Sequence, residues 1–235
     1  DFLPQSVKKA LLIDSDIIVL DSLKELYETD IDKFVFAAAI PHNAYYHHKK
    51  YGNLYLNIGV TLYNVKKYNE ERVFERLISE LVQADLDEPA PDETLLANLV
   101  VDKEKYPILP RYNVLDFNTC IPPKSLKIFG NFYYNYFEES FWEDALKNPA
   151  VLHFNFIDLI RPWLMNKRPP KYYKKYFAIY YDLLKETPFS NHKFSPKKFS
   201  KKKRLDLFLR YRIFRLPIFL LKPIYKLYRK MSGNK

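Results

Sequence analysis

Two aspartates interrupt the most apolar stretch near the start of the sequence. Residues 10–13 (ALLI) and 17–20 (IIVL) are wholly apolar, and Asp14 and Asp16 lie between them. A run of four apolar residues is typical of a buried strand. Side chains two residues apart in an extended chain point the same way, so both carboxylates can converge at the end of that strand. An ionised carboxylate in apolar surroundings is costly unless it is paired or binds a metal ion.

A divalent cation is the simplest partner for this carboxylate pair. The nearest basic residues are Lys8, Lys9 and Lys24, and none belongs to the apolar run. Oxygen ligands favour Mg²⁺ or Mn²⁺. A second interpretation is that Asp14 and Asp16 only cap the turn that follows. The pair by itself leaves both interpretations open.

A hydrophobic strand followed by Asp-x-Asp also opens the haloacid-dehalogenase phosphatases, in which the first Asp is the nucleophile. Those enzymes usually carry a later GDxxxD-like or paired-Asp motif for Mg²⁺. The glycines are at positions 52, 59, 130 and 233, and none begins a GDxxxD motif. Such scarcity of glycine also argues against Gly-rich phosphate loops. A phosphatase of this type is a distant third alternative.

Apolar segments and helical patterns alternate along the first 190 residues, which predicts an α/β fold. Strands are predicted at residues 10–13, 34–40, 54–64 and 150–157, with an Asn–Ile–Gly break inside the third, and residues 106–115 are predicted to form a short strand and a turn. Helices are predicted at residues 21–28, 69–83, 131–147, from Asp92, and after residue 163. Ser22 and Glu25 have the spacing of a capping box at the first helix. The polar, His- and Tyr-rich stretch 42–53 is predicted to be a loop.

Positive charge is concentrated at the C-terminal end of the sequence. The whole chain carries +10, but residues 192–235 hold 15 Lys or Arg and one acid, which gives +14 there and −4 in residues 1–191. Apolar and aromatic residues alternate with these bases, and Pro217 and Pro223 are expected to break the segment into short helices. This composition predicts helices on an anionic membrane surface. The acidic body and the lack of a known binding module argue against nucleic acid.

One face of the C-terminal segment is apolar on a helical wheel, although Arg212 lies on it and must snorkel. Its apolar members are Leu205, Phe208, Leu209, Ile213 and Leu216. The apolar content is too high for a disordered, solvated tail. We therefore predict two domains: a folded α/β domain at residues 1–190, and a basic, aromatic, membrane-associating tail at residues 191–235.

The number of cysteines and the length of the apolar runs indicate the cellular compartment of the protein. Cys120 is the single cysteine, which excludes a disulfide framework and fits a reducing compartment. No apolar run approaches the roughly 20 residues that span a bilayer. We expect a cytoplasmic protein that is peripheral on the inner face of the membrane.

Four segments, taken in order, resemble the retaining glycosyltransferases of family 8. They are LLIDSDIIVLDSLKELY (residues 11–27), YLNIGVTLYNVKKY (55–68), PDETLLANLV (91–100) and PAVLHFNFIDLIRPW (149–163). Their order and spacing carry the resemblance, which covers about residues 7–170. In style, the sequence resembles bacterial lipopolysaccharide and lipooligosaccharide galactosyl- or glucosyltransferases, including the basic tail.

The resemblance implies a GT-A fold, a Rossmann-like mixed sheet flanked by helices. It implies transfer of a hexose from UDP-galactose or UDP-glucose to a saccharide or glycolipid acceptor, with the α-configuration retained. It also implies a Mn²⁺ (or Mg²⁺) ion that bridges the diphosphate. By position, Asp14, Asp16 and His153 would be its ligands, and two oxygens with one imidazole suit Mn²⁺.

Four further residues match positions that bind the donor sugar in this family. Asn57 and Gly59 match its N-x-G motif; a bulge in a strand is the alternative, and the two interpretations are compatible. Asp92 matches an Asp that binds sugar hydroxyls. Glu93 stands where the family usually has Gln, near the anomeric carbon. A carboxylate there would support an oxocarbenium-like centre; the alternative is ordinary complementarity to a helix dipole.

The last motif departs from the family pattern. From His153 the family would place Gly three residues on and Lys six on, then Pro-Trp. Here Phe156 replaces the Gly, and Arg161 precedes Pro-Trp. Arg161 can still bind a diphosphate oxygen. Lys167 and Arg168 are further candidates, with a solvated basic face as the alternative.

The Asp-x-Asp motif comes earlier here than in the family, where roughly the first third of the chain precedes it. We therefore expect a chain that is N-terminally incomplete and lacks the first nucleotide-binding strands, since a sheet without them exposes an apolar edge. A natural degenerate relative is the alternative. A second class of function is a non-catalytic, membrane-associated relative of the same fold that has lost donor binding.

Overall fold

The structure is a computed structural model that describes residues 3–4, 6–41, 43–82, 91–115, 121–155, 161–164, 174–193, 200–213 and 215–231. The chain divides into two compact units. The first comprises Asp1–Asn113 and Asn148–Val151, and the second Val114–Lys147 and Leu152–Lys235.

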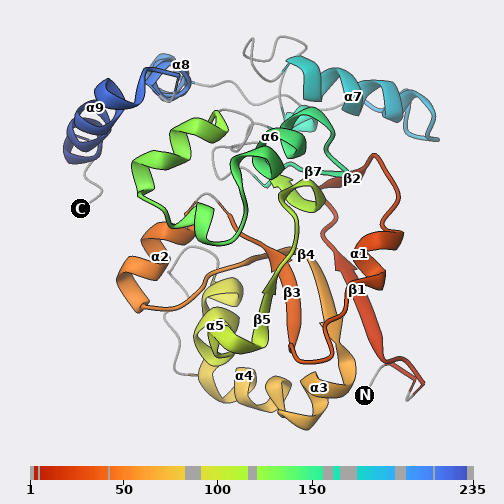
Figure 1. Cartoon of the computed structure of the whole chain (residues 1–235). Coiled ribbons are helices and arrows are strands. Elements are labelled where there is room, and N and C mark those ends of the chain that lie inside the picture. Colours follow the sequence, from red (N-terminus) through yellow and green to blue (C-terminus); the bar gives the residue numbers. More distant parts are fainter. Residues whose placement is uncertain are drawn as a thin grey trace. The chain divides into compact units, whose positions relative to one another are not determined.

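The first unit is built on a four-stranded mixed sheet (Figure 1). Its strand order is β1 (Lys9–Ile13), β4 (Asn57–Asn64), β3 (Phe36–Ala39) and β5 (Lys105–Pro107). β4 runs antiparallel to β1 and β3, and β5 runs parallel to β3. All four residues of β3 are buried, as its unbroken apolar sequence predicts for a central strand. The predicted α/β class is therefore confirmed.

β4 changes register near its start. Ala38 pairs with Thr61, whereas Ala39 pairs with Asn57. The hydroxyl of Thr61 donates to the carbonyl of Ile58 at 2.7 Å, which satisfies a backbone acceptor in the irregular stretch. The predicted break at Asn–Ile–Gly is confirmed, and the strand begins at this break instead of continuing through it from residue 54.

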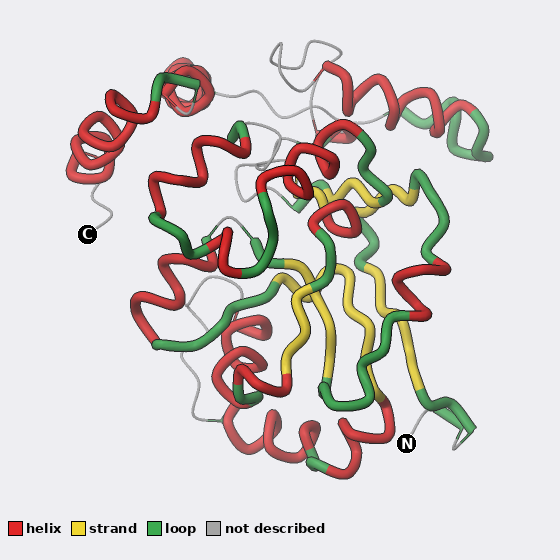
Figure 2. The backbone as a smooth tube through the Cα atoms, in the orientation of Figure 1, coloured by secondary structure: helices red, strands yellow, loops and turns green. Residues whose placement is uncertain are grey.

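Helices of the first unit lie around this sheet, with α5 beside β5 and α1 beside β1 (Figures 1 and 2). They are α1 (Lys24–Glu28), α2 (Ala44–Tyr51), α3 (Val65–Glu70), α4 (Val73–Leu81) and α5 (Pro91–Leu99), with 3₁₀ turns η1 (Asp102–Glu104) and η2 (Pro110–Asn113). The amphipathic helix predicted at 69–83 is confirmed in α4, but its predicted start is wrong, because residues 69–70 belong to α3. Arg72 takes a left-handed conformation (φ 50°), which separates α3 from α4.

The loop predicted at 42–53 is also wrong, because α2 occupies most of it. The segment has no regular apolar spacing, so its helix is stabilised by ring packing instead. The ring of His47 lies 4.5 Å from that of Tyr51 and 4.4 Å from that of Tyr55. Gly52 ends the helix in a left-handed conformation (φ 77°), and its N–H donates to the carbonyl of His48 at 2.8 Å.

The capping box predicted at the first helix does not form. The N–H of Ser22 donates to Asp21 Oδ1 at 2.8 Å, and Ser22 Oγ accepts from the N–H of Lys24 at 3.2 Å. Glu25 Oε2 accepts instead from the hydroxyl of Tyr112 at 2.8 Å. This tertiary hydrogen bond takes the carboxylate away from the local backbone.

The core of the first unit joins β3 and β4 to the segments that flank them. Its buried members come from strands, from α1 and from the turn before Val151. They are Leu26, Ile31, Ala37, Ala39, Val60, Leu62, Ile108, Tyr112, Ala150 and Val151. This core fixes the strand ends from which the candidate site residues extend.

The second unit contains a parallel strand pair and an aromatic cluster. β7 (Val151–His153) pairs with β6 (Val114–Leu115) in a sheet of order β2 (Ile17–Val19), β7, β6. The cluster packs Phe129, Phe132 and Trp142 around Tyr133, with ring centroids 5.1–5.7 Å apart. Helical elements are η4 (Pro123–Phe129), η5 (Tyr133–Asn135), α6 (Glu139–Lys147), η6 (Pro162–Leu164), α7 (Lys174–Lys185), α8 (Lys201–Ile213) and α9 (Ile218–Met231).

The basic C-terminal segment forms α8 and α9. Pro217 lies between them as predicted, but Pro223 lies inside α9, so the predicted second break is wrong. Leu221 is buried, and the ring of Tyr225 packs on that of Phe129 in η4 with centroids 6.0 Å apart, so side chains on both sides of the proline are packed. Within the described residues, no helix is both long and apolar enough to cross a bilayer.

We expect Gly52→Ala to lower the free energy of unfolding by about 1 kcal/mol, because an L residue is strained in the left-handed conformation. A Cβ at Gly52 would meet no atom within 4 Å, so the backbone alone produces the effect. Gly52→Asn serves as the control, since Asn tolerates this conformation better, and should lose less. Urea denaturation measures both, and equal stability of the Ala variant and the parent would contradict the assignment.

Candidate active site

The carboxylate pair lies in the turn between β1 and β2. Asp14 follows the last residue of β1 and is exposed, whereas Asp16 is half-buried. The backbone N–H of Asp14 donates to the carbonyl of Gly59 at 2.8 Å. The Asp-x-Asp and N-x-G segments are therefore joined by a direct backbone hydrogen bond.

His153 is the last residue of β7 and is almost completely buried. One ligand atom from each of Asp14, Asp16 and His153 lies within 4.8 Å of the other two. The three residues that the resemblance implies as metal ligands are thus brought together. Two carboxylates and an imidazole are a donor set that fits Mn²⁺ or Mg²⁺.

Glu93 lies in the first turn of α5, where the helix dipole favours a carboxylate. It is nevertheless buried, and both of its oxygens accept hydrogen bonds. Oε1 accepts from Asn57 Nδ2 at 2.6 Å, and Oε2 accepts from the hydroxyl of Tyr55. Dipole complementarity therefore describes only part of its environment, because specific donors also fix the carboxylate.

The amide of Asn57 is oriented by its neighbours. Its Oδ1 accepts from Asn113 Nδ2 at 2.6 Å and from the N–H of Gly59 at 3.3 Å. Its Nδ2 therefore faces Glu93. Asn57 marks the irregular start of β4, so the bulge interpretation of N-x-G is confirmed, while donor binding by Asn57 and Gly59 stays a prediction.

Burial raises the pKa of Glu93 from 4.5 to about 7. The hydrogen bond from Tyr55 opposes this shift, while the negative charges of Asp92 and Asp14 add to it. Burial, followed by the charge of Glu93, also raises the pKa of Tyr55 far above its ordinary value, so its hydroxyl stays protonated. Asp92 is exposed at the start of α5.

Arg161 is held close to the backbone that follows His153. Its Nε donates to the carbonyl of Phe154 at 3.0 Å, and its guanidinium lies 5.7 Å from the ring centroid of Trp163. The hydroxyl of Tyr181 donates to the carbonyl of Pro162 at 2.8 Å, which fastens this turn to α7. Phe156, Lys167 and Arg168 lie outside the described residues.

Sequence reasoning missed Tyr55 and Asn113, which hold Glu93 and Asn57. Tyr55 could have been found, because it precedes Asn57 by two residues and side chains two apart in an extended chain share a side. Asn113 left no such signal. It is distant in sequence and reaches Asn57 only through the packing of η2.

Comparison with known proteins identifies the family. The family model for glycosyl transferase family 8 matches residues 1–167. The chain belongs to this family. It is 24% identical over 185 residues to general stress protein A of Bacillus subtilis, covering 74% of this chain and 58% of that protein. It is 29% identical over 119 residues to a putative glycosyltransferase of Haemophilus influenzae, covering 46% of this chain and 35% of that protein.

Solved structures share the fold of this family 8 chain. The galactosyltransferase LgtC in complex with donor and acceptor sugar analogues matches with a TM-score of 0.56 and 19% identity, over 85% of this chain and 65% of that chain. The glycosyltransferase GlyE of Streptococcus pneumoniae matches with a TM-score of 0.51 and 22% identity, over 85% and 46%. These likenesses support the mixed α/β fold of GT-A type. The chain spans less than two thirds of the length of these relatives.

The raised pKa of Glu93 predicts that the free energy of unfolding falls as pH rises. Below pH 4.5 both states hold the proton; from there to about pH 7 the unfolded chain releases it while the folded chain keeps it. Unfolding then releases a proton, so the free energy of unfolding falls as pH rises, by up to about 3 kcal/mol from this group.

Glu93→Gln should remove this contribution. Urea denaturation of the metal-free protein and of the variant between about pH 5 and 8 measures the difference in slope. Identical slopes in the two proteins would show that Glu93 titrates normally.

Proposed function

We propose that this protein is a retaining hexosyltransferase that moves galactose or glucose from a UDP-sugar to a glycan or lipid-linked saccharide. The observation that carries the proposal is the convergence of Asp14, Asp16 and His153 within 4.8 Å in a chain of family 8. Two carboxylates and a buried imidazole together suit a divalent cation.

Asp14, Asp16 and His153 would hold Mn²⁺ or Mg²⁺. When bound, the ion would supply positive charge that offsets the charge of the UDP leaving group. Arg161 can add a bidentate contact to a diphosphate oxygen, because its guanidinium is oriented by Phe154 and Trp163.

The donor sugar would bind between the N-x-G segment and the start of α5. Asn57 uses one amide N–H for Glu93, and an amide has a second N–H that can donate to a sugar hydroxyl. Gly59 lets the backbone approach closely. Asp92 is exposed and can accept hydrogen bonds from sugar hydroxyls.

Glu93 would stabilise positive charge that develops at the anomeric carbon. Tyr55 and Asn57 hold its carboxylate in one orientation, so little reorganisation is needed. In LgtC an active-site mutant replaces a glutamine with a glutamate, so a protein of this fold has been solved with that residue type in its active site. Above about pH 7 the carboxyl is increasingly ionised.

The second candidate function is a non-catalytic relative that holds the metal without turning over a donor. The burial of Glu93, with both oxygens occupied, is the observation that favours it. Turnover separates the two, because only the transferase releases UDP.

We also propose that α8 and α9 attach the protein to an anionic membrane on the cytoplasmic side, where a lipid-linked acceptor would be presented. Exposed apolar side chains accompany the bases on both helices. They are Leu205, Phe208, Leu209, Ile218, Phe219, Leu220 and Leu227. The guanidinium of Arg212 lies 5.3 Å from the ring centroid of Phe208, an arrangement that suits an interface between apolar and polar phases.

The transferase proposal predicts UDP release from UDP-galactose or UDP-glucose by the full-length protein, dependent on Mn²⁺ and abolished by a chelator. Asp14→Asn and His153→Ala should each lower turnover at least about 100-fold, since each removes one ligand. Titration of Mn²⁺ followed by electron paramagnetic resonance should show matching losses of affinity.

Asp182→Asn and His192→Ala are matched controls in exposed positions of the second unit and should leave both measurements unchanged. Mn²⁺ binding without any UDP release would favour the non-catalytic relative. Unchanged Mn²⁺ affinity in Asp14→Asn and His153→Ala would overturn the metal site.

The membrane proposal predicts that the protein sediments with vesicles containing phosphatidylglycerol and not with pure phosphatidylcholine. The double variant Phe208→Ser, Phe219→Ser should bind several-fold more weakly, because two apolar side chains no longer enter the interface. Phe74→Ser changes a comparably exposed ring on α4 and is the control. Equal sedimentation of all three proteins would contradict the proposal.

A further inference from the structure

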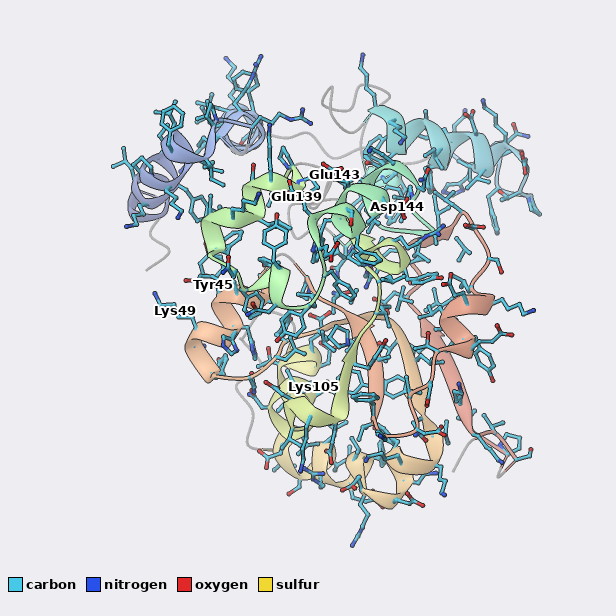
Figure 3. The ribbon with its side chains drawn as sticks, in the orientation of Figure 1. Tyr45, Lys49, Lys105, Glu139, Glu143 and Asp144 are labelled. Carbon is cyan, nitrogen blue, oxygen red and sulfur yellow. The ribbon has the colours of Figure 1, made fainter. Side chains whose placement is uncertain are left out.

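Lys105 on β5 is a buried lysine with no exposed side-chain surface, near α5 in Figure 3. An ammonium group has three N–H donors, and three acceptors surround this one. They are the carbonyl of Leu54 at 2.8 Å, the carbonyl of Ala97 at 2.7 Å and Oδ1 of Asp102 at 2.9 Å. Fully buried lysines are rare, because removing the charge from water is costly.

Asp102 and Asn53 extend this arrangement, and we call the three residues the Lys105 cluster. Asp102 Oδ1 also accepts from the N–H of Leu54 at 2.7 Å, so both backbone polar groups of Leu54 are bound by the pair. Asn53 Nδ2 donates to the carbonyl of Ala97 at 3.1 Å and to Asn98 Oδ1 at 2.8 Å. The cluster thus ties residues 53–54 to the C-terminal end of α5.

The same segment continues into the residues that hold Glu93. Tyr55 and Asn57 donate to the two oxygens of Glu93, four residues before Ala97. Positions four apart in a helix lie on one face. Residues 53–57 therefore run along one face of α5 and are fastened at both ends, by the Lys105 cluster at one and by Glu93 at the other.

We propose that Lys105 is a positioning residue for Glu93: by fixing the end of α5 to β5 and to Leu54, it holds Glu93 against Tyr55 and Asn57. An apolar side chain would fill the same space at lower cost. The ammonium instead makes directed bonds to carbonyls of two separate segments. Its positive charge also complements the C-terminal end of α5. The inference has a mechanical part, that Lys105 fixes the position of Glu93, and a catalytic part, that this position matters for turnover. Only the catalytic part rests on the proposed function.

Lys105→Met keeps an unbranched side chain, shorter only by the terminal nitrogen, and removes all three hydrogen bonds. We expect amide hydrogen exchange to increase about tenfold or more at residues 91–99 and also at residues 55–57. Lys103→Met, an exposed lysine of the same segment, is the matched control and should change neither. Increased exchange at α5 with residues 55–57 unchanged would overturn the inference, whether or not the protein turns over a donor.

Two milder variants guard against global unfolding of Lys105→Met. Asp102→Asn keeps the acceptor but removes the charge of a side chain that is 44% exposed, and Asn53→Ala removes only the bonds to Ala97 and Asn98. Each should increase exchange at the same residues by a smaller factor. If neither variant changes exchange at residues 55–57, the cluster does not act on Glu93.

Turnover of the UDP-hexose tests the catalytic part in a double-mutant cycle. Lys105→Met should lower kcat about tenfold with a smaller change in KM for the donor, yet have little further effect when combined with Glu93→Gln. A purely structural lysine would lower kcat by the same factor in both backgrounds, and that result would overturn the positioning role. Absence of turnover in the unmodified protein would instead count against the proposed function, and hydrogen exchange would still decide the mechanical part.

Discussion

The pairing of β4 with both β1 and β3 is the constraint on which the candidate site depends. β4 holds β1 over its full length, and this pairing ends where Ile13 meets Val60. The next residue, Asp14, then bonds to Gly59, so the Asp-x-Asp turn starts from the irregular start of β4. The same irregularity presents Asn57 to Glu93. The start of β4 therefore contacts both the Asp-x-Asp turn and Glu93.

Polar groups are buried around this sheet only where partners satisfy them. Asn57, Glu93 and Lys105 are each almost inaccessible, and each has hydrogen-bond partners from a different segment of the chain. Burying such a polar group costs free energy. Forming its hydrogen bonds offsets that cost only in part, whereas removing one partner destabilises the fold by more than the pair contributed. These groups add little to stability, but they restrict α5 and residues 53–57 to a single arrangement.

The α/β class, the main strands and the convergence of Asp14, Asp16 and His153 were predicted from the sequence. Those predictions rest on unbroken apolar runs and on motifs, which are local. The errors arose where a tertiary contact outweighed the local pattern. α2 forms because ring packing of His47 replaces apolar spacing, and Glu25 leaves its expected cap for Tyr112. Lys105 could not be distinguished from surface lysines, since its acceptors are mostly backbone carbonyls of distant segments.

Glu93 stands where the sequence resemblance implies a glutamine, and the donors around it bear on what that difference does. The hydroxyl of Tyr55 and the amide of Asn57 both donate, so they suit an acceptor-only carboxylate. A glutamine would also fit, provided that Tyr55 accepted from its amide instead of donating. The carboxylate is thus not required for the fold, and its raised pKa means that it lowers stability near neutral pH. A charge that opposes folding, where a neutral isostere could stand, supports the proposal that Glu93 faces developing positive charge on a bound donor.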